Sequence, residues 1–411
     1  MKTSINNQQI YFRGYDARPL KAICLSSPKK ELGLELERIG KKSGFDVFIP
    51  SGRTLLKASE AKYAYADLSS SPWAQDTATF TPKKKIITCE FFDDFADNLS
   101  RKFGISKEFD KNIPQGGNMY YIKDSDGKDI MLVGLDSKKQ LEKLENPKDV
   151  FGVCEIQYIP QMDFHIDLFV RPLDNKRILL TDDSLTIKAF NKGIKSIQKL
   201  LKKEPEKTEL LTIKENLDKE LTKFKKSVLN NAQAPREDVK DILENNGFQV
   251  IGVPGRIYQT FPEPEDIQIT EDYIREVSNK KSKKLDFLPM FSEELLSFYP
   301  RVSKEKSIQP EEQQLTHLLN YMNAIITKNK KGEMVYISNK SDFDKRIGLT
   351  PQIIKESGFS FEKEFVNSLK PYIKEENVYF VEGKNGEIQD SLENLAGGIH
   401  CLTTEMPNFD F

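Results

Sequence analysis

Hydrophobic residues in the first part of the chain follow strand and helix patterns in turn. LKAICL (20–25) alternates as a strand does, and FDVFIP (45–50) is a second strand-like run. Between them, Leu32, Leu36 and Ile39 recur at helical spacing. A strand, a helix and a strand within about 30 residues have the size of a βαβ unit. The pattern predicts an α/β protein.

The same two patterns recur further along the chain. Strand-like runs lie at KKIITCEFF (84–92), FQVIGVPG (248–255), EMVYIS (333–338) and NVYFVEG (377–383). Hairpins are predicted where YYIK and DIMLVG flank DSDG, and where FHIDLFV and RILL flank PLDNK. FEKEFVNSLKPYI, between the last two strands, has the pattern of a helix. No repeat is visible at the level of sequence.

The composition changes between residues 186 and 246, where LKKEPEKTELLTIKENLDKELTKFKKSVL is rich in Lys, Glu and Leu. Leu217 and Phe224 lie on one apolar stripe at helical spacing. Charges of both signs are interspersed, as on a solvated helix face. We predict a helical insertion at 186–246 within a catalytic domain formed by 1–185 and 247–411.

Charge and composition narrow the choice of partner and compartment. The 411 residues, 38% of them hydrophobic, suffice for a sizeable core. With 62 basic and 63 acidic residues the formal net charge is -1, so we expect no nucleic-acid partner. No run of about 18 apolar residues offers a membrane span, and the four cysteines are widely spaced. We expect no membrane partner, and a cytoplasmic protein or one exported without a conventional signal peptide.

Three separated segments hold residues suited to catalysis: PWAQDTATF (72–80), DFHIDLFV (163–170) and GGIHCLTTEMP (397–407). Taken singly, each has an ordinary structural explanation. Cys401 could be a small buried hydrophobe, and His165 a hydrogen-bonded core histidine. Together the segments supply a nucleophile, a general base and carboxylates.

The predicted geometry makes this set more specific. In a strand, residues two apart share a face, so His165 and Asp167 project side by side while their neighbours face the core. An imidazole and a carboxylate in an apolar run need partners if they are buried. The glycines at 397 and 398 supply a backbone that can bend tightly just before Cys401.

Two carboxylates beside a cysteine and a histidine suggest a cationic substrate. An ester or amide hydrolase needs hydrogen-bond donors that face an oxyanion, whereas Asp76 and Asp167 are acceptors. Carboxylates bind and orient a planar guanidinium through paired, charge-assisted hydrogen bonds. The residues therefore favour a guanidinium substrate.

Four motifs also resemble those of known enzymes. WAQD followed by TATF resembles W-x-[RQ]-D-T-G-P-x-F of agmatine deiminases, and its start is similar to the segment of peptidylarginine deiminases. QGGNMYY (115–121) is similar to the Gly-rich loop that follows in both. FHIDLFV resembles G-H-V-D-E-F, and GGIHCLTTEMP resembles G-G-x-I-H-C-x-T-x-x-x-P. The motifs occur in the order seen in the guanidine-modifying (pentein) superfamily, whereas similarity outside them is slight.

This resemblance implies a pentein fold, a five-bladed α/β propeller with the active site on its axis. It implies that Cys401 is the nucleophile, that His165 is the general acid and base, and that Asp76 and Asp167 hold the guanidinium. The same motifs imply four substrate-binding residues: Trp73, Gln75, Gly117 and Asn118.

The sequence departs from the agmatine deiminase pattern at three positions. Ala78 stands in place of its Gly, Thr79 in place of its Pro, and Leu168 in place of the acidic residue after H-x-D. The changes at Ala78 and Leu168 argue against agmatine, whose distal ammonium calls for an acid-lined chamber, and the helical insertion leaves room to recognise a macromolecule. We therefore predict protein arginine as the substrate and citrulline as the product.

The implied reaction is that of a hydrolase acting on the C–N bond of an amidine, through a covalent thiouronium on Cys401 and with release of ammonia. No cofactor and no metal are expected, because His165, His317 and His400 are not at ligand spacing. His400 is interpreted as structural, since neighbours in an extended segment point apart.

Several alternatives stay open. The first is an agmatine deiminase, or another small-guanidine hydrolase or amidinotransferase. The second is a cysteine protease or a transglutaminase-like enzyme, which would not need Asp76. The third is a catalytically silent binding protein on the same fold. The partner is accordingly an arginine-containing protein or a small guanidine.

Overall fold

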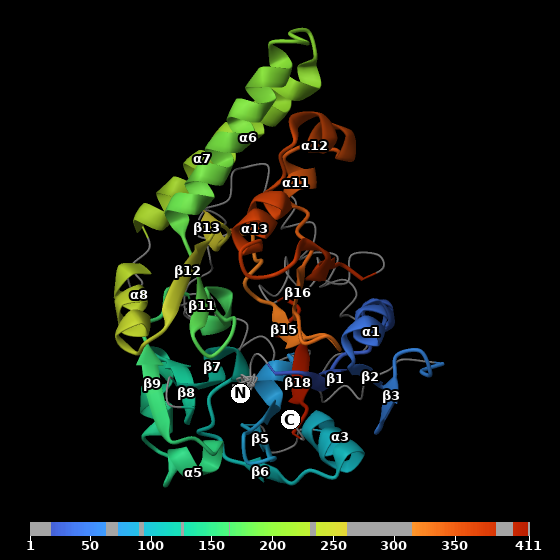
Figure 1. The fold of residues 1–411 in the computed structure, drawn as a ribbon, viewed down its shortest axis with the longest axis vertical. Helices are drawn as coiled ribbons and strands as arrows, with labels where there is room; N and C mark the ends of the chain where they lie inside the picture. Colours follow the sequence, from blue (N-terminus) through green and yellow to red (C-terminus); the bar gives the residue numbers. More distant parts are fainter. Residues whose placement is uncertain are drawn as a thin grey trace, which may run out of the picture.

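The computed structural model (Figure 1) describes residues 18–62, 73–89, 94–124, 127–163, 165–230, 236–260, 315–383 and 398–409. In this part of the chain the strands form five sheets of three or four strands and one two-stranded hairpin. Helices connect strands within the sheets, so the predicted α/β class is confirmed.

One connectivity recurs from sheet to sheet. β4 (Thr79–Phe80) pairs antiparallel with β5 (Ile86–Thr88), and β6 (Lys107–Phe109) pairs parallel with β5 on its other side. The chain passes from β5 to β6 through α3 (Asp94–Phe103), because parallel neighbours require a crossover connection. Each such unit is two antiparallel strands, a helical connection and a third, parallel strand.

Two more units have this order. The first contains β7 (Met119–Lys123), β8 (Asp129–Gly134), α4 (Lys138–Leu141), α5 (Pro147–Phe151) and β9 (Glu155–Ile159). The second contains β15 (Ile325–Lys328), β16 (Met334–Asn339), α11 (Phe343–Arg346), α12 (Pro351–Ser357), α13 (Phe361–Leu369) and β17 (Val378–Val381). The strands predicted at 333–338 and 377–383 and the helix between them are confirmed.

Another unit is built from both ends of the chain. β18 (Thr403–Pro407) pairs antiparallel with β1 (Leu20–Leu25), and β2 (Asp46–Pro50) pairs parallel with β1. The connection is α1 (Lys30–Ser43), and β3 (Leu55–Lys57) extends the sheet beyond β2. In Figure 1, red β18 accordingly lies beside blue β1. The strand, helix and strand predicted near the N-terminus are confirmed.

The fifth unit contains the segment predicted to be helical. β10 (Val170–Pro172) and β11 (Arg177–Thr181) form the predicted hairpin, and β12 (Gln249–Val253) lies parallel to β11. The crossover between β11 and β12 consists of three helices: α6 (Asp183–Leu201), α7 (Thr208–Asn230) and α8 (Arg236–Asn245).

The paired helices α6 and α7 extend away from the sheets (Figure 1). The described residues of segment 186–246 are therefore mostly helical, and the segment belongs to the enlarged connection of one unit. The division of the chain into a catalytic domain and an inserted domain stays a prediction. The remaining strands, β13 (Ile257–Thr260) and β14 (Leu315–Leu318), form an antiparallel hairpin.

Two predicted strands are shorter than expected. The segment predicted as a strand at 163–170 bends instead into a 3₁₀ turn at Ile166–Leu168 before β10 begins, and Phe164 lies outside the described residues. In the predicted strand 84–92, only β5 is a strand, and residues 90–93 also lie outside the described residues. Ile166 and Leu168 are buried in the core as expected, although the backbone between them is a turn.

The first strand of each unit is preceded by a short turn, bend or helix. These segments are α2 (Ala74–Thr77) before β4, Gly116–Asn118 before β7, Ile166–Leu168 before β10, the bend at 322–323 before β15, and the turn at 399–402 before β18. All the predicted catalytic residues lie in or directly beside these segments. The recurring connectivity therefore places them at equivalent positions of different units.

Candidate active site

Gly117 lies where three of the predicted catalytic side chains meet. A β-carbon added to this glycine would lie 2.6 Å from His165 Nδ1 and 3.2 Å from both Asp167 Oδ2 and Asp76 Oδ1. The Gly117 N–H donates a 2.8 Å hydrogen bond to the same Asp76 oxygen. A side chain at position 117 would fill the space between these groups, so the site requires glycine here.

Cys401 joins this group through Asp167. Its Sγ lies 3.4 Å from Asp167 Oδ2 and 3.0 Å from Nδ2 of Asn323, which also donates to Asp167 Oδ2 at 2.8 Å. The side chains are buried: Cys401 is 4% exposed, His165 5% and Asp167 0%. The structure thus brings the four residues predicted to be catalytic into one cluster.

The turn that carries Cys401 depends on a close approach at Gly398. An added β-carbon would lie 2.3 Å from Asn339 Nδ2 and 2.7 Å from Asn323 Oδ1, and the φ angle of Gly398 is outside the left-handed range. This glycine is therefore required for space and not for the tight bend expected from the sequence. Gly397 lies outside the described residues.

His165 is held by a residue from another unit. Its Nε2 lies 2.8 Å from Oε1 of Gln115. An amide oxygen only accepts hydrogen bonds, so this contact requires a proton on Nε2. Nδ1, the atom that faces Gly117, is then the ring nitrogen that can take up a proton.

The cluster keeps Cys401 protonated in the protein without substrate. Burial raises the pKa of the Cys401 thiol well above its usual value, and the negative charges of Asp167 and Asp76 raise it further. The hydrogen bond from Asn323 acts in the opposite direction. A cation that neutralises the two carboxylates would lower the pKa of this thiol.

One carboxylate oxygen of Asp167 can accept hydrogen bonds from such a cation. Oδ1 is buried and has no hydrogen-bond partner among the residues that the structure describes, whereas Oδ2 contacts Asn323, His400 and Cys401. An unpaired buried carboxylate oxygen costs free energy that a hydrogen-bonding cation would recover.

His400 is part of the cluster, contrary to the sequence argument that it points away. Residues 399–402 form a turn and not an extended segment, and Nδ1 of His400 lies 2.8 Å from Asp167 Oδ2. Burial and the nearby charge of Arg171 lower the pKa of His400 to about 4. The neutral ring therefore donates its Nδ1 proton to Asp167 and holds the carboxylate in place.

Beneath His400 lies a buried ion pair. Arg171 is fully buried, its Nη2 lies 3.3 Å from Glu405 Oε1, and its guanidinium covers the ring of Tyr120. The same Glu405 oxygen is 3.7 Å from Nε2 of His400. This pair joins β10 to β18 and so holds together the two units that carry Asp167 and Cys401.

The residues predicted to bind substrate differ in what they contact. Gln75 donates its backbone N–H to the Cys401 carbonyl at 3.2 Å, which ties α2 to the Cys401 turn. Asn118 donates to Ser137 Oγ and accepts from the N–H of Ile166, so it supports the turn that carries Asp167. Trp73 is half-buried against the core.

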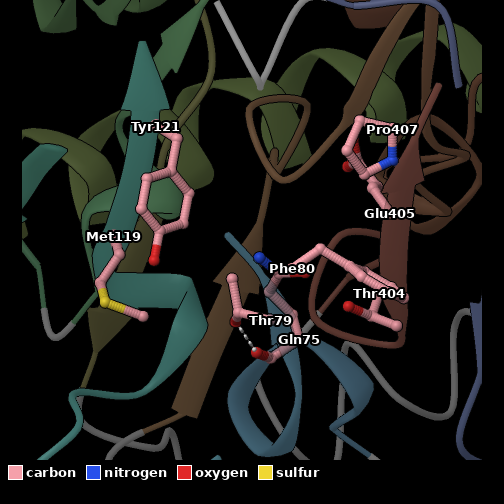
Figure 2. A pocket seen from close by; sticks show the side chains of 8 residues that line it. All are labelled: Gln75, Thr79, Phe80, Met119, Tyr121, Thr404, Glu405 and Pro407. Atoms are coloured by element: carbon pink, nitrogen blue, oxygen red, sulfur yellow. Dashed lines mark hydrogen bonds between the residues drawn. The ribbon is translucent and has the colours of Figure 1, made fainter. Parts of the chain in front are cut away.

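Figure 2 shows a small pocket lined by residues of α2 and of the first strands of three units, β4, β7 and β18. Its wall includes Gln75 beside the site, Tyr121 on β7 and Glu405 on β18. Oε1 of Gln75 has no hydrogen-bond partner among the described residues. The side chains that line this pocket are mostly polar, which suits water better than an apolar ligand.

Of the departures from the agmatine deiminase pattern, Thr79 lines the pocket of Figure 2, whereas Ala78 and Leu168 do not. Ala78 is 1% exposed and Leu168 2% exposed, and both pack in hydrophobic clusters of the core. Ala78 and Leu168 therefore serve packing, and the preference for protein arginine over agmatine stays a prediction.

Among the helices that the structure describes, none is long and apolar enough to cross a membrane. Within the described ranges, no group of three or more His, Cys, Asp or Glu side chains is placed to hold a metal ion.

Known proteins were compared with the chain by sequence and by structure. No family model matches it, and no curated protein matches it. Its structure is similar to an agmatine deiminase from C. jejuni, with 14% identity, 98% of this chain and 99% of the other covered, and a TM-score of 0.45.

Two further solved structures are similar over almost the whole chain. An agmatine deiminase from Enterococcus faecalis has 10% identity, covers 97% and 96% of the two chains, and gives a TM-score of 0.49. An amidinotransferase from Microseira wollei has 10% identity, covers 97% of each chain, and gives a TM-score of 0.43. Agmatine deiminases and an amidinotransferase are thus among the solved structures to which this chain is similar, and at these TM-scores the similarity assigns neither fold, reaction nor substrate.

Proposed function

We propose that this protein is a guanidine deiminase of the pentein type, in which Cys401 attacks a guanidinium held by Asp76 and Asp167. The observation that carries the proposal is the Asp167 carboxylate: its Oδ2 lies 3.4 Å from the Cys401 sulfur, and its buried Oδ1 has no hydrogen-bond partner among the described residues. A planar cation with several N–H donors satisfies this oxygen and places its central carbon beside sulfur.

The recurring units support a five-bladed propeller as the fold. Five sheets share one connectivity, and the segment before each first strand contributes to the cluster around Cys401 and Gly117. A closed ring of five such units would put these segments around one axis. Pairing of β18 with β1 would then close the ring.

The proposed reaction begins when the guanidinium binds and neutralises the two carboxylates. The Cys401 pKa falls, His165 Nδ1 takes the thiol proton, and sulfur attacks the guanidinium carbon. The carbon–nitrogen bond breaks, and His165 returns the proton to the departing ammonia. A thiouronium remains on Cys401. Water, deprotonated by His165, attacks this carbon, the carbon–sulfur bond breaks, and a ureido product leaves.

The predicted substrate is protein arginine, and agmatine is a second candidate. The depth of Cys401, His165 and Asp167 favours a guanidinium at the end of a slender chain, which both compounds supply. Ala78 and Leu168 pack in the core, so these two positions are weaker evidence against agmatine than the sequence alone suggested.

A substrate panel tests the proposal. Purified protein is incubated with arginine peptides, a folded arginine-containing protein, free arginine and agmatine, and ammonia and ureido products are measured. We expect ammonia from at least one guanidine, and none after Cys401→Ala. Cys154→Ala, which changes an exposed cysteine, is the matched control and should keep full activity. A wild-type protein that releases no ammonia from the panel would refute the deiminase.

The alternatives give different results in the same assay. An amidinotransferase forms a new guanidino compound when an acceptor amine is added and releases little ammonia. A cysteine protease would keep its activity in Asp76→Asn, whereas the deiminase should lose at least about 100-fold, because an oriented, charge-assisted contact is gone. A silent binding protein would bind guanidines without turnover.

A further inference from the structure

Asn323 was not identified from the sequence, yet its side chain contacts the proposed nucleophile directly. Nδ2 donates to Cys401 Sγ at 3.0 Å and to Asp167 Oδ2 at 2.8 Å. Oδ1 accepts from the backbone N–H groups of His400 at 2.9 Å and of Cys401 at 3.3 Å. The residue is 0% exposed, so these contacts take place away from solvent.

The backbone contacts fix which way the amide points. Two N–H groups of the Cys401 turn face one end of the side chain, and backbone N–H groups can only donate. The oxygen must therefore occupy that end, and the nitrogen must face the sulfur and the carboxylate. The same geometry leaves each of the two amide protons with its own acceptor.

We propose that Asn323 is a catalytic residue that donates a hydrogen bond to the Cys401 sulfur and holds it beside Asp167 for attack on the guanidinium. The reaction step rests on the proposed function. The contact itself does not, and it can be tested without substrate.

The physical reason is the charge that sulfur acquires. A neutral amide donor binds a thiolate more strongly than a thiol, since hydrogen bonds to ionised groups are the stronger ones. Asp167 and Asp76 oppose ionisation of Cys401, and Asn323 is the neighbour that favours it. Loss of this donor should make the thiolate harder to form.

Asn339 offers a matched control in the same turn. Its Oδ1 accepts from the N–H of Ile399 at 2.6 Å, and its Nδ2 donates to the carbonyls of Asn320 and Asn323. It is 1% exposed and, like Asn323, supports the residues just before Cys401. The two asparagines differ because the described bonds of Asn339 run to backbone groups.

The experiment compares four variants: Asn323→Ser, Asn323→Asp, Asn339→Ser and Asn339→Asp. Alkylation of Cys401 by iodoacetamide is followed from pH 6 to 10 by mass spectrometry of the Cys401 peptide, without substrate. The exposed Cys154 in the same samples is the internal standard. Thermal unfolding is recorded for each variant, and kcat and KM are measured on the best guanidine.

Both Asn323 variants should move the alkylation profile of Cys401 to higher pH, the Asp variant further because it adds a negative charge. Their kcat should fall about 10- to 100-fold, because loss of one hydrogen bond to a charged group raises the activation barrier by a corresponding amount. The change in KM should be smaller. Asn339→Ser should lower thermal stability and leave the alkylation profile at its wild-type position, and Asn339→Asp, which adds charge without removing the donor to sulfur, should shift the profile less than Asn323→Asp.

The inference is overturned if Asn323→Ser leaves the alkylation profile unchanged, or if the Asn339 variants shift it equally. Asn323→Ser is decisive if the Asp variant does not fold, because it removes the amide group that reaches the sulfur without adding charge. A wild type that fails to turn over guanidines refutes the proposed function and leaves the alkylation result standing, so the two failures are distinguishable.

Discussion

Asp167 uses its two carboxylate oxygens differently. Oδ2 receives hydrogen bonds from Asn323 and His400 and lies beside the Cys401 sulfur, while Oδ1 has no hydrogen-bond partner among the described residues. One oxygen therefore fixes the carboxylate in place, and the other is directed to a ligand. These different roles of the two oxygens are the basis of the proposed guanidinium site.

The low pKa of His400 predicts how the stability of the protein depends on pH. Its pKa is about 4 in the folded protein and near 6.5 in an unfolded chain, so between these values the unfolded chain binds the extra proton. Stability should fall from this source as pH drops from 6.5 towards 4, by up to roughly 3 kcal/mol. In His400→Asn, which keeps a donor for Asp167 but does not titrate, urea unfolding should show a smaller loss between pH 7 and pH 5. An equal loss would show that His400 is not the titrating group.

The site residues were predictable from the sequence to different degrees. Cys401, His165, Asp167 and Asp76 stand in recognisable motifs, so their convergence was expected. Asn323 stands in HLLNYMNAII, where the available signal was a polar residue in an apolar run directly before a strand. Which group such a residue satisfies depends on contacts with the Cys401 turn, far away in the sequence.

At the scale of elements, local patterns predicted strands and helices well where one face is buried. The helix at 30–43 and the hairpin of β7 and β8 follow directly from alternation and turn sequences. The 3₁₀ turn at Ile166–Leu168 was missed, since it is stabilised by long-range contacts, such as the bond from the Ile166 N–H to Asn118. A run of apolar residues alone does not reveal such a bend.

Gly116 and Gly117 are adjacent, yet substitutions at the two positions should affect different properties of the protein. In Gly117→Ala the new methyl group would lie among His165, Asp167 and Asp76, so activity should fall by more than about 100-fold, because displacement of reacting groups by about 1 Å costs this much. Gly116→Ala would place a β-carbon 2.0 Å from the backbone oxygen of Gln75 and should lower the thermal midpoint instead. Activity assays and thermal melts distinguish the two. Full activity in Gly117→Ala would mean that this space is not the substrate site.

The helix α7 is attached to the molecule through its apolar stripe. Phe224 is fully buried and its ring lies 6.0 Å from that of Phe190 on α6. Phe224→Ala should lower the free energy of unfolding by about 3 to 5 kcal/mol, the usual cost of removing a buried aromatic ring. Leu211→Ala on the same helix is the control: that side chain is 43% exposed, and the expected change is within about 0.5 kcal/mol. Denaturant titrations giving equal effects would contradict this packing.

Polar contacts between units, as well as the hydrophobic core, hold the whole molecule together. Arg171 on β10 and Glu405 on β18 are 234 positions apart in the sequence, and their ion pair lies next to the proposed active site. Neither residue has a sequence signature, because only the assembled units bring them together. The pair fixes the relative position of the segments that carry Asp167 and Cys401.

A double-mutant cycle tests this link. Glu405→Gln should cost about 3 to 5 kcal/mol of stability, because it leaves the Arg171 charge buried without its ionic partner. Adding Arg171→Met should recover most of that loss, since it removes the stranded charge. Unfolding by urea measures Glu405→Gln, Arg171→Met and the double variant. Strictly additive losses would show that the two residues do not act as a pair.

The central claim is that Cys401 forms a covalent bond with a guanidinium carbon. Wild-type protein is mixed with a substrate from the panel, quenched with acid during turnover, and digested, and the Cys401 peptide is weighed by mass spectrometry. The account predicts an adduct on Cys401 whose mass is that of the substrate less one ammonia, increased in amount when water attack is slowed, and absent in Asp76→Asn. An adduct containing only the amidino group would indicate an amidinotransferase. An unmodified Cys401 during turnover, or an adduct on another residue, would contradict the account.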